Sequence, residues 1–519
     1  MRMNLNQFLG QSVAKRGAAV AWEWGDTSMT YAEFGERVDR IAAAVAAAGL
    51  RLGDRCAFLL HNRPEILELY FGLAARGVVA VPVNFRSVER EITHVLDDSS
   101  PRVLVFEEAL LPVVAEVRDR TPDRTISYVI IGSGPRWAKR YDEWLAESAE
   151  YEPEQVIVEP DAPFFLAYTS GTTGAPKGAV ITHAGLIRNN LSLMLEYGAA
   201  SETRSRFLTL MPMFHSNSTW FATGCMMVGG TNIIHPTGKF DARDVLRTIA
   251  DRHITHTSVV PTMLKMMADL GPDAVRGLDL SSLEWFLCGS APISLALKRE
   301  VESTFQVRVS EGYGSTETGL VSSLRMSDPD SKKASVGRAT IGTEISVRDH
   351  EGRACGIGEV GDVWTRGETV LLTEYWKNPA ATAKAFDEDR WLTVGDMGYL
   401  DEDGFLFLTD RKNDLIISGG ENVYPSEVEG VLLTHPDIAE VAVVPLPDDH
   451  WGQVVRAVVA LKPGHRLSAA EVVAHARAGL AGFKVPRVVD FVDALPKNST
   501  GKILRRLVRD GAPISKERS

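Results

Sequence analysis

Residues 168–180 read YTSGTTGAPKGAV, and this stretch decides the fold. It holds four Ser/Thr hydroxyls, three glycines and one lysine, a composition that cannot build a packed core. It follows the apolar run FFLAY and precedes the helical pattern HAGLIRNNLSLML. A strand, a glycine-rich loop and a helix in this order present backbone N–H groups to a phosphate. The stretch therefore predicts a phosphate-binding loop beside a sheet.

This loop does not follow the Walker pattern, because Gly178 succeeds Lys177 where that pattern needs Ser or Thr. We therefore expect another type of phosphate loop, in which hydroxyls donate to phosphate oxygens and Lys177 supplies positive charge. A mobile linker is the alternative, and it is less favoured because linkers are not usually ordered so closely between a core strand and a helix. The expected phosphate contacts are Thr169, Ser170, Gly171, Thr172, Thr173, Gly174 and Lys177.

Length, charge and cysteine content limit the classes of protein that this chain can represent. Its 519 residues exceed what one hydrophobic core usually supports, so we expect at least two domains. The net charge of −12, without a basic block, argues against a nucleic-acid partner. Four scattered cysteines without a CxxC pair favour a reducing compartment. No apolar run reaches the roughly 18–20 residues of a membrane span, and the N-terminus lacks signal-peptide features, so we expect a cytoplasmic protein without a transmembrane segment.

The pattern of elements changes twice along the chain. Up to about residue 337, short apolar runs alternate with helical patterns, which predicts a mostly parallel sheet covered by helices. Residues 344–370 then read as antiparallel hairpins with turns at HEGR and GIGE, and TDRKND at 409–414 precedes a small unit. The predicted fold class is α/β: a large N-terminal domain of mostly parallel α/β sheets plus an antiparallel β subdomain, with a small mobile α+β C-terminal domain. The predicted domains are 1–410, 411–508 and a disordered tail at 509–519.

Six further motifs occur along the chain: MPMFH (211–215), GSAP (289–292), EGYGSTETG (311–319), VGD (394–396), DRKNDLIISGGENVYPSEVE (410–429) and PKNSTGKILRR (496–506). Together with the opening loop, and in this order, they resemble the signatures of the adenylate-forming superfamily. That superfamily includes acyl-CoA synthetases, peptide-synthetase adenylation domains and firefly luciferase. The resemblance implies an AMP-forming carboxylate–CoA ligase, which uses ATP, Mg²⁺ and CoA together with a small carboxylic acid.

The resemblance also implies an ATP site. In it Tyr313 stacks on adenine, Thr316 touches the α-phosphate and Glu317 holds Mg²⁺, a hard cation that prefers oxygen ligands. Asp396 grips the ribose, although Val394 stands where relatives have threonine. The implied ATP contacts outside the loop are Gly289, Ser290, Ala291, Pro292, Glu311, Gly312, Tyr313, Gly314, Thr316, Asp396, Arg411 and Lys502.

Catalysis and CoA binding are implied in the same way. Lys502 is the cation delivered to the α-phosphate, because preorganised cations stabilise developing phosphoryl charge. The implied catalytic residues are Lys502, Glu317, Thr316 and His215. The implied CoA contacts are Ser418, Gly419, Gly420, Glu421, Trp451 and Lys484. Rotation of the small domain is expected at Asn413, where relatives commonly carry Asp or Lys.

The acyl pocket is the least determined part of the site. Its candidates are His215, Asn217, Trp220, Val260, Gly289, Gly314 and Thr318. They mix polar and bulky groups. If Trp220 points inward it would shorten the acyl tunnel, which favours medium, aromatic or polar acids over very long chains. His253 and His256 have loose metal-like spacing, but no third ligand is evident and a strand entry is preferred.

Three alternatives stay open from the sequence alone. The acyl acceptor can be a carrier-protein thiol or oxygen instead of CoA, although no carrier-like domain follows residue 506. A non-catalytic nucleotide-binding regulator is the other rival, which the presence of Lys177, Glu317, Asp396 and Lys502 disfavours. A homodimer is also left open.

Overall fold

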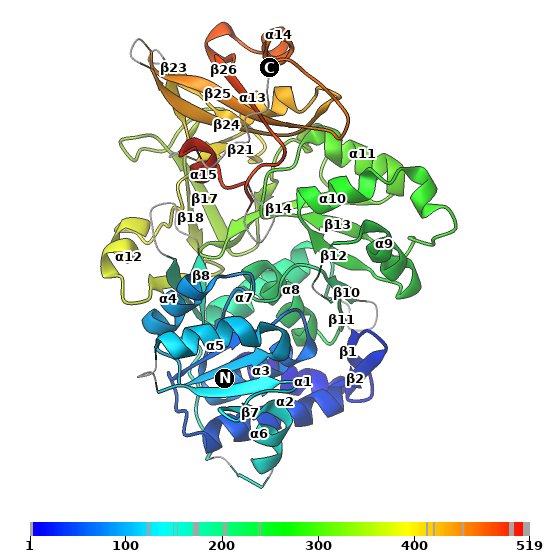
Figure 1. The fold of residues 1–519 in the computed structure, drawn as a ribbon, viewed down its shortest axis with the longest axis vertical. Coiled ribbons are helices and arrows are strands. Elements are labelled where there is room, and N and C mark those ends of the chain that lie inside the picture. The colour runs from blue at the N-terminus through cyan, green and yellow to red at the C-terminus, as the bar shows by residue number, and fades with distance from the viewer. Residues whose placement is uncertain are drawn as a thin grey trace.

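The structure is a computed structural model, and it describes most of the chain. It describes residues 4–121, 125–148, 150–152, 154–169, 176–200, 205–236, 238, 240–411, 414–418, 421–448, 451–497 and 503–511, with the backbone alone for 410, 411 and 422. Figure 1 shows the N-terminal elements at one end of the molecule and the C-terminal elements at the other. Among the described residues, no helix is long and apolar enough to cross a bilayer.

An eight-stranded sheet forms the N-terminal part. In spatial order its strands are β19 (Leu372–Tyr375), β9 (Lys177–Thr182), β8 (Pro163–Thr169), β4 (Val79–Pro82), β3 (Arg55–Leu59), β5 (Val103–Glu107), β6 (Ser127–Ile131) and β7 (Ala138–Arg140). The strands from β8 to β7 pair in parallel, while β9 and β19 are antiparallel additions at one edge.

A nine-stranded sheet lies beside it. In spatial order its strands are β16 (Arg338–Ala339), β15 (Gly319–Leu324), β14 (Arg308–Ser315), β13 (Trp285–Cys288), β12 (His256–Val259), β10 (Arg206–Thr209), β11 (Thr231–Ile234), β1 (Val20–Trp24) and β2 (Thr27–Thr30). The central strands are parallel, and both edges end in antiparallel strands.

Helices cover both large sheets. The helices that precede the C-terminal part are α1 (Leu5–Arg16), α2 (Tyr31–Ala47), α3 (Pro64–Arg76), α4 (Glu89–Ser99), α5 (Leu111–Arg120), α6 (Tyr141–Glu147), α7 (His183–Glu196), α8 (Ser216–Met227), α9 (Ala242–Asp251), α10 (Pro261–Ala268), α11 (Leu295–Phe305) and α12 (Pro379–Ala385). Four short 3₁₀ turns occur at Glu108–Leu110, Pro272–Val275, Asp330–Lys332 and Gly482–Lys484. Helix ends follow local sequence: Thr30 and Glu33 form a capping box at the start of α2, and Gly77 ends α3 with φ of 62°.

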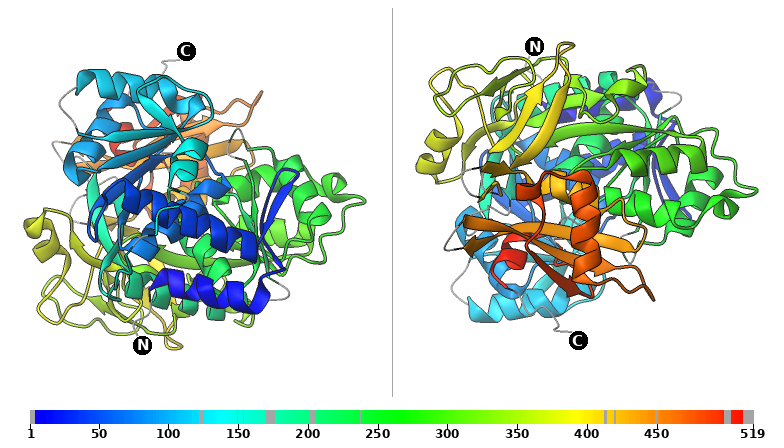
Figure 2. Two further views of the ribbon diagram at one scale, coloured as in Figure 1. Left: turned by 90° about the horizontal axis from the view of Figure 1, so that it is seen from below. Right: turned by 90° about the horizontal axis from the view of Figure 1, so that it is seen from above.

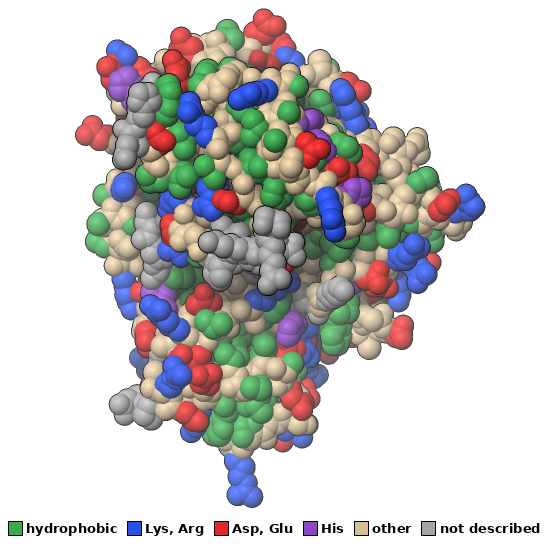
Figure 3. Space-filling model, turned by 45° about the horizontal axis from the view of Figure 1, so that its top comes forward, with side chains coloured by type: hydrophobic (Ala, Val, Ile, Leu, Met, Phe, Trp, Pro, Cys, Tyr) green, Lys and Arg blue, Asp and Glu red, His purple; other side chains and the backbone are tan. Residues whose placement is uncertain are grey.

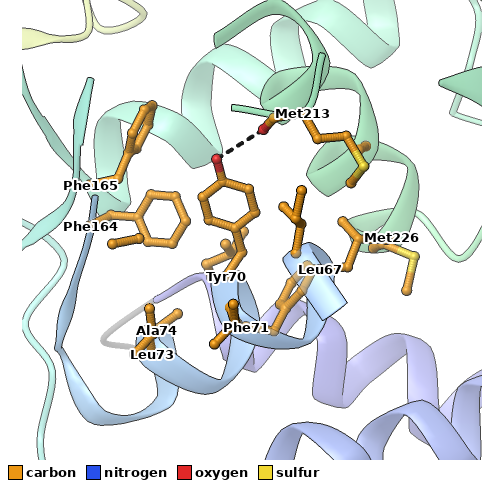
Figure 4. Packing of buried hydrophobic residues seen from close by; sticks show 14 of the residues in the cluster. Leu67, Tyr70, Phe71, Leu73, Ala74, Phe164, Phe165, Met213 and Met226 are labelled. Atoms are coloured by element: carbon orange, nitrogen blue, oxygen red, sulfur yellow. Dashed lines mark hydrogen bonds between the residues drawn. The ribbon is translucent and has the colours of Figure 1, made fainter. Parts of the chain in front are cut away.

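The largest core lies between the two sheets, where α3, α7 and α8 pack. Every residue of α8 except Asn217 is buried, as expected for a helix enclosed on all sides. Tyr70 of α3 packs beside Phe164 and Phe165 of β8, and its hydroxyl donates to the Met213 carbonyl over 3.2 Å (Figure 4). This contact ties the eight-stranded sheet to the segment that leads into α8.

The C-terminal half contains two smaller sheets. The four-stranded sheet comprises β17 (Thr343–Arg348), β18 (Gly361–Gly367), β20 (Asp396–Leu400) and β21 (Leu406–Arg411), all antiparallel. The five-stranded sheet comprises β23 (Glu421–Val423), β22 (Ile416–Ser418), β25 (Gly452–Leu461), β24 (Ile438–Asp448) and β26 (Val488–Val492). Its helices are α13 (Pro425–Leu432), α14 (Ala469–Gly479) and α15 (Arg505–Arg509).

The architecture confirms the predicted fold class. The antiparallel pair β17–β18 confirms the hairpins expected over 344–370, and the bridge between Arg348 and Ala354 closes the HEGR turn. Figure 2 shows the C-terminal sheet and its helices stacked over one end of the larger part. On the face seen in Figure 3, the coloured Lys/Arg and Asp/Glu side chains are interspersed, so that face presents neither sign of charge alone.

Candidate active site

The glycine-rich loop joins two antiparallel strands. Thr169, the last residue of β8, lies opposite Lys177, the first residue of β9, and α7 begins only at His183. The predicted order of strand, loop and helix is therefore wrong: a strand separates the loop from the helix. The physical reason is that KGAVIT, with its β-branched residues, pairs along β8 and β19. The helix N-terminus therefore follows β9 and not the loop. Of the expected phosphate contacts, Ser170, Gly171, Thr172, Thr173 and Gly174 lie outside the described residues.

Glu317 lies at the roots of this loop. Its Oε1 accepts from the Thr169 hydroxyl over 3.3 Å and from the Tyr375 hydroxyl over 3.0 Å. The Lys177 ammonium lies 5.4 Å from the centroid of the Tyr375 ring. The Glu317 side chain is thus held between β8, β9 and β19, and the residue is only 9% exposed. The arrangement places one carboxylate, one ammonium and one threonine hydroxyl, which donates to that carboxylate, at the two ends of the loop.

Tyr375 is a site residue that sequence reasoning missed. Burial, followed by the charge and hydrogen bond of Glu317, raises the pKa of its phenol, so the hydroxyl remains a donor at neutral pH. It is separated from Glu317 by 58 residues, and nothing local in LTEYW predicts the contact. Only the pairing of β19 with β9 brings it to the loop.

Thr316 and Thr318 belong to the turn between β14 and β15. The Ser216 hydroxyl, at the first position of α8, donates to Thr316 Oγ1 over 3.0 Å. Thr318 is 2% exposed, and its Oγ1 accepts from the Ser315 backbone N–H over 2.8 Å. Thr316 is therefore joined to α8, whereas the Thr318 hydroxyl shapes the turn itself. A Cβ on Gly314 would lie 2.0 Å from the Gly319 carbonyl oxygen, which excludes any side chain there.

Tyr313 and Asp396 are brought together from two different sheets. The Tyr313 hydroxyl donates to Asp396 Oδ2 over 2.8 Å, joining β14 to β20. Asp396 also lies opposite Arg411 in the backbone register of β20 and β21. Beside Val394, the Thr393 Oγ1 accepts from the Gly395 N–H over 3.2 Å. The residues expected at adenine and ribose thus form one contact.

Glu311 forms an ion pair with a residue of α11. Its Oε2 lies 2.5 Å from Lys298 Nζ, and the two side chains are 8% and 1% exposed. Burial raises the pKa of the Glu311 carboxyl, and the Lys298 charge opposes that rise. The carboxylate is therefore engaged in a buried ion pair with α11, and any nucleotide contact of Glu311 would come from its backbone.

GSAP and the start of α8 are neighbours. A Cβ added to Gly289 would lie 3.3 Å from the Gly312 carbonyl oxygen and 3.9 Å from Asn217 Nδ2. Ser290 has φ of 66°, a left-handed conformation that is uncommon outside glycine and is enriched at functional sites. Ala291 is half-buried and Pro292 exposed. Glycine at 289 thus keeps open the space between β13 and the Asn217 side chain.

His215 precedes α8, and its ring lies tilted beside that of Phe214, with 5.1 Å between the ring centroids. Burial lowers the pKa of its imidazole to about 4, with a smaller contribution from the Arg86 charge. Its ring is therefore neutral at physiological pH and can orient a carboxylate only as a hydrogen-bonding group. Trp220 and Val260, at 6% and 4% exposure, are buried in the packing around α8 and at the start of α10.

The oxygen ligands at the loop suit a hard cation. Glu317 supplies a carboxylate, and Thr316 and Thr169 supply hydroxyls, the donor type that Mg²⁺ prefers. His256 lies in β12 against the edge of Trp285, at 4.7 Å between ring centroids, which agrees with the strand interpretation. Within the described ranges, His, Cys, Asp and Glu form no group of three or more that could hold a metal.

Helix α4 braces both roots of the loop, which sequence reasoning also missed. The Tyr168 hydroxyl donates to Asp98 Oδ2 over 2.6 Å, and His94 Nε2 donates to the Pro176 carbonyl over 2.9 Å. Trp376 Nε1 donates to the Asp98 carbonyl over 3.1 Å, from 278 residues away. The neighbours of Thr169, Lys177 and Tyr375 are thus fixed to one helix end.

The expected CoA contacts lie on the C-terminal sheet. Trp451 is 38% exposed, and the Arg487 guanidinium lies 4.7 Å from its ring centroid. Lys484 Nζ lies 2.6 Å from Glu427 Oε1. Ser418 is buried opposite the exposed Glu421. Besides the loop residues named above, four predicted residues lie outside the described ranges: Asn413, Gly419, Gly420 and Lys502.

Comparison with known proteins identifies the class of this chain. Residues 9–376 match the family model described as AMP-binding enzyme, and residues 427–502 match the AMP-binding enzyme C-terminal domain. The chain therefore belongs to the AMP-binding enzymes of the adenylate-forming superfamily, which confirms the family indicated by the motifs.

Individual relatives and solved structures are also similar to this chain. The chain is 37% identical over 489 residues to a fatty acid–[acyl-carrier-protein] ligase, ScoC, of Streptomyces coeruleorubidus, covering 93% of this chain and 91% of that protein. It is 36% identical over 510 residues to a feruloyl-CoA synthase of Amycolatopsis sp, covering 97% and 99%. Among solved structures it resembles the o-succinylbenzoate CoA synthetase MenE of Bacillus subtilis in complex with its acyl-adenylate, with a TM-score of 0.87, 30% identity and complete coverage of both chains.

Proposed function

We propose that the protein is an AMP-forming carboxylate–CoA ligase. The carboxylate of an acid attacks the α-phosphorus of ATP, pyrophosphate leaves, and acyl-AMP is formed. The sulfur of CoA then attacks the acyl carbonyl, and AMP leaves. The observation that carries this proposal is the convergence of Thr169, Lys177 and Glu317 at the two roots of the loop.

Each residue has a physical task in this scheme. Lys177 offsets negative charge on the phosphates, and Thr316 touches the α-phosphate; the hydrogen bond from Ser216 supports a fixed position for Thr316. The Tyr313–Asp396 pair offers an aromatic face and a carboxylate to the nucleoside. Mg²⁺, when bound through Glu317, neutralises phosphate charge. Neutral His215 orients the acid.

The relatives and the surface of the C-terminal part both bear on which acyl acceptor the protein uses. The feruloyl-CoA synthase supports CoA, whereas ScoC supports a carrier protein as the second candidate. We favour CoA because Trp451 and Arg487 form an exposed aromatic and cationic surface suited to its nucleotide. We also propose that the small domain starts at residue 411 and rotates between the two steps; the change of sheet between Arg411 and Ile416 supports this division.

The deciding experiment separates the two half-reactions. ATP–pyrophosphate exchange with a panel of carboxylic acids measures adenylation, and release of AMP with CoA, with a phosphopantetheinyl carrier protein or with neither measures the acceptor. Exchange and CoA-dependent AMP release are expected together. Pyrophosphate exchange accompanied by AMP release only with the carrier protein would favour a carrier protein as the acyl acceptor. A cytoplasmic location is proposed with this activity, and the four free cysteines agree with it.

Asp98→Ala is expected to raise the KM for ATP by about tenfold, because the half-buried Tyr168 loses a charge-assisted hydrogen bond and the loop roots loosen. Pyrophosphate exchange against ATP concentration measures this. Tyr168→Phe removes the other partner of the same bond. The effects of the two substitutions should therefore not add in the double variant, and fully additive effects would contradict the brace.

Trp220→Ala is expected to shift acyl preference toward longer acids, by roughly tenfold in the ratio of kcat/KM for long over short chains. The ring is buried one turn beyond Ser216, on the helix that borders Gly289. AMP release from a series of linear acids measures the shift. Because truncating a buried tryptophan costs about 3–5 kcal/mol, Trp220→Leu and a melting curve serve as controls. If both variants fold and their dependence of kcat/KM on acid chain length is unchanged, Trp220 does not line the acyl site.

A further inference from the structure

Three polar atoms around the first turns of α8 are buried without a hydrogen-bond partner among the described residues. They are Asn217 Oδ1, Trp220 Nε1 and Ser258 Oγ. Trp220 and Ser258 are 6% and 3% exposed. Buried polar atoms are nearly always hydrogen-bonded in folded proteins, so three exceptions in one region need an explanation.

The three atoms border one place in the fold. Asn217 and Trp220 are three residues apart on α8, which puts them on neighbouring positions of its surface. The Asn217 side chain reaches the space over Gly289, 3.9 Å from where a Cβ would stand. Ser258 lies opposite Leu287 in the pairing of β12 with β13, and Leu287 is two residues before Gly289.

The register decides which face of the sheet Ser258 occupies. Residues paired across strands share a face, and so do residues two apart along a strand. Ser258, Leu287 and Gly289 therefore lie on one face of the nine-stranded sheet. Leu287 packs in the same core as Trp220 and Phe221 of α8. Ser258 accordingly faces α8, together with the space over Gly289.

The space over Gly289 lies next to the residues expected to hold the carboxylate of the acid. Ser216, which contacts Thr316, is the residue before Asn217, and His215 precedes both. An acid whose carboxylate lies between His215 and Thr316 would extend its acyl portion over Gly289, past Asn217 and toward Ser258. The three unpartnered atoms therefore border the acyl portion and not the carboxylate.

The chemistry of the three atoms selects a type of acyl group. Asn217 offers an acceptor, Trp220 a donor and Ser258 a hydroxyl that can do either. A hydroxyl group on the substrate both donates and accepts, so it can pair with any of them. A saturated chain would leave all three buried and unpaired, and sites built this way reject analogues that lack the polar group.

We propose that the natural acid carries a hydroxyl group on its acyl portion and that Asn217 and Ser258 select for it. This inference rests on the proposed ligase function. It deepens that function, because the motifs themselves leave fatty, aromatic and polar acids open.

The test compares acids that differ only by a hydroxyl group. The enzyme is assayed for pyrophosphate exchange and CoA-dependent AMP release with linear acids hydroxylated at each carbon in turn, with phenylpropanoate hydroxylated at each ring position in turn, and with the unsubstituted parents. At least one hydroxylated acid is expected to exceed its parent by about tenfold or more in kcat/KM. Parents that equal or exceed all their hydroxylated partners would overturn this inference while leaving the ligase function intact. Exchange with no acid of either kind would overturn the ligase function and this inference with it.

Variants then test which side chains select for the hydroxyl group of the acid. Asn217→Leu and Ser258→Ala are each expected to lower kcat/KM for the preferred hydroxylated acid while that for its parent stays level or rises. Ser218→Ala is the matched control, because the Ser218 hydroxyl is paired with the Met211 carbonyl at 2.7 Å. Its ratio of hydroxylated to parent acid should equal that of the unmodified enzyme. If the ratio of kcat/KM for the hydroxylated acid over its parent is unchanged in both Asn217→Leu and Ser258→Ala, these two residues do not select for the hydroxyl group. The preference of the unmodified enzyme tests the proposal even if a variant fails to fold.

Discussion

Glu317→Gln is expected to lower acid-dependent pyrophosphate exchange by roughly a hundredfold to a thousandfold. Glutamine keeps the size of the side chain and an oxygen that can accept from Thr169 and Tyr375. It loses the negative charge, which is the property that a divalent cation requires of its protein ligand. The loss should therefore fall on Mg·ATP use and not on folding.

The measurement is exchange as a function of Mg²⁺ concentration, with a melting curve beside it. Tyr375→Phe is the matched control, since it removes one hydrogen bond to the same oxygen and leaves the charge in place. Tyr375→Phe should lower pyrophosphate exchange by about tenfold or less, because it removes a single neutral hydrogen-bond donor. Full activity of Glu317→Gln at saturating Mg²⁺ would show that the cation is held elsewhere.

Lys502→Ala is expected to separate the two half-reactions. Adenylation should fall by roughly a hundredfold or more, because a preorganised cation at the α-phosphate is removed. Thioester formation from supplied acyl-AMP should be largely retained, because in the proposed scheme that step uses the other orientation of the small domain. Lys502 lies outside the described residues, so this prediction rests on the motif PKNSTGKILRR.

The chain offers a control in the same motif. Lys497 forms an ion pair with Glu440 on β24, and Lys497→Ala should leave both half-reactions close to those of the unmodified enzyme. Such exposed pairs contribute little to stability. Equal loss of adenylation and thioester formation in Lys502→Ala would argue for misfolding or for a different role of this lysine.

Motif residues could be predicted from the sequence because each motif is a continuous segment. Glu317 and Thr316 share one turn, and Tyr313 precedes them on the same strand. The hairpin over 344–370 was equally accessible, since its turn residues and alternating pattern are local. The positions of such motifs are therefore open to sequence reasoning.

The segment after the loop could not be assigned in the same way. KGAVIT is six residues long, and a short apolar run of this kind fits either a strand or the approach to a helix. Its state is set by the two strands beside it, β8 and β19, and β19 lies nearly two hundred residues further along the chain. Tertiary pairing outweighs local pattern at such positions.

The sequence by itself determined the family and the α/β fold class, because both can be read from short segments whose chemistry is local. Only the tertiary structure decided which side chains hold the motif residues: Tyr375 on Glu317, Asp98 on Tyr168, Lys298 on Glu311 and Ser216 on Thr316. Among the described residues, it also leaves Asn217 Oδ1, Trp220 Nε1 and Ser258 Oγ buried without a hydrogen-bond partner, with the Asn217 side chain beside Gly289. The physical reason is that hydrogen bonds and burial depend on distance in space, and strand pairing across long stretches of chain sets that distance.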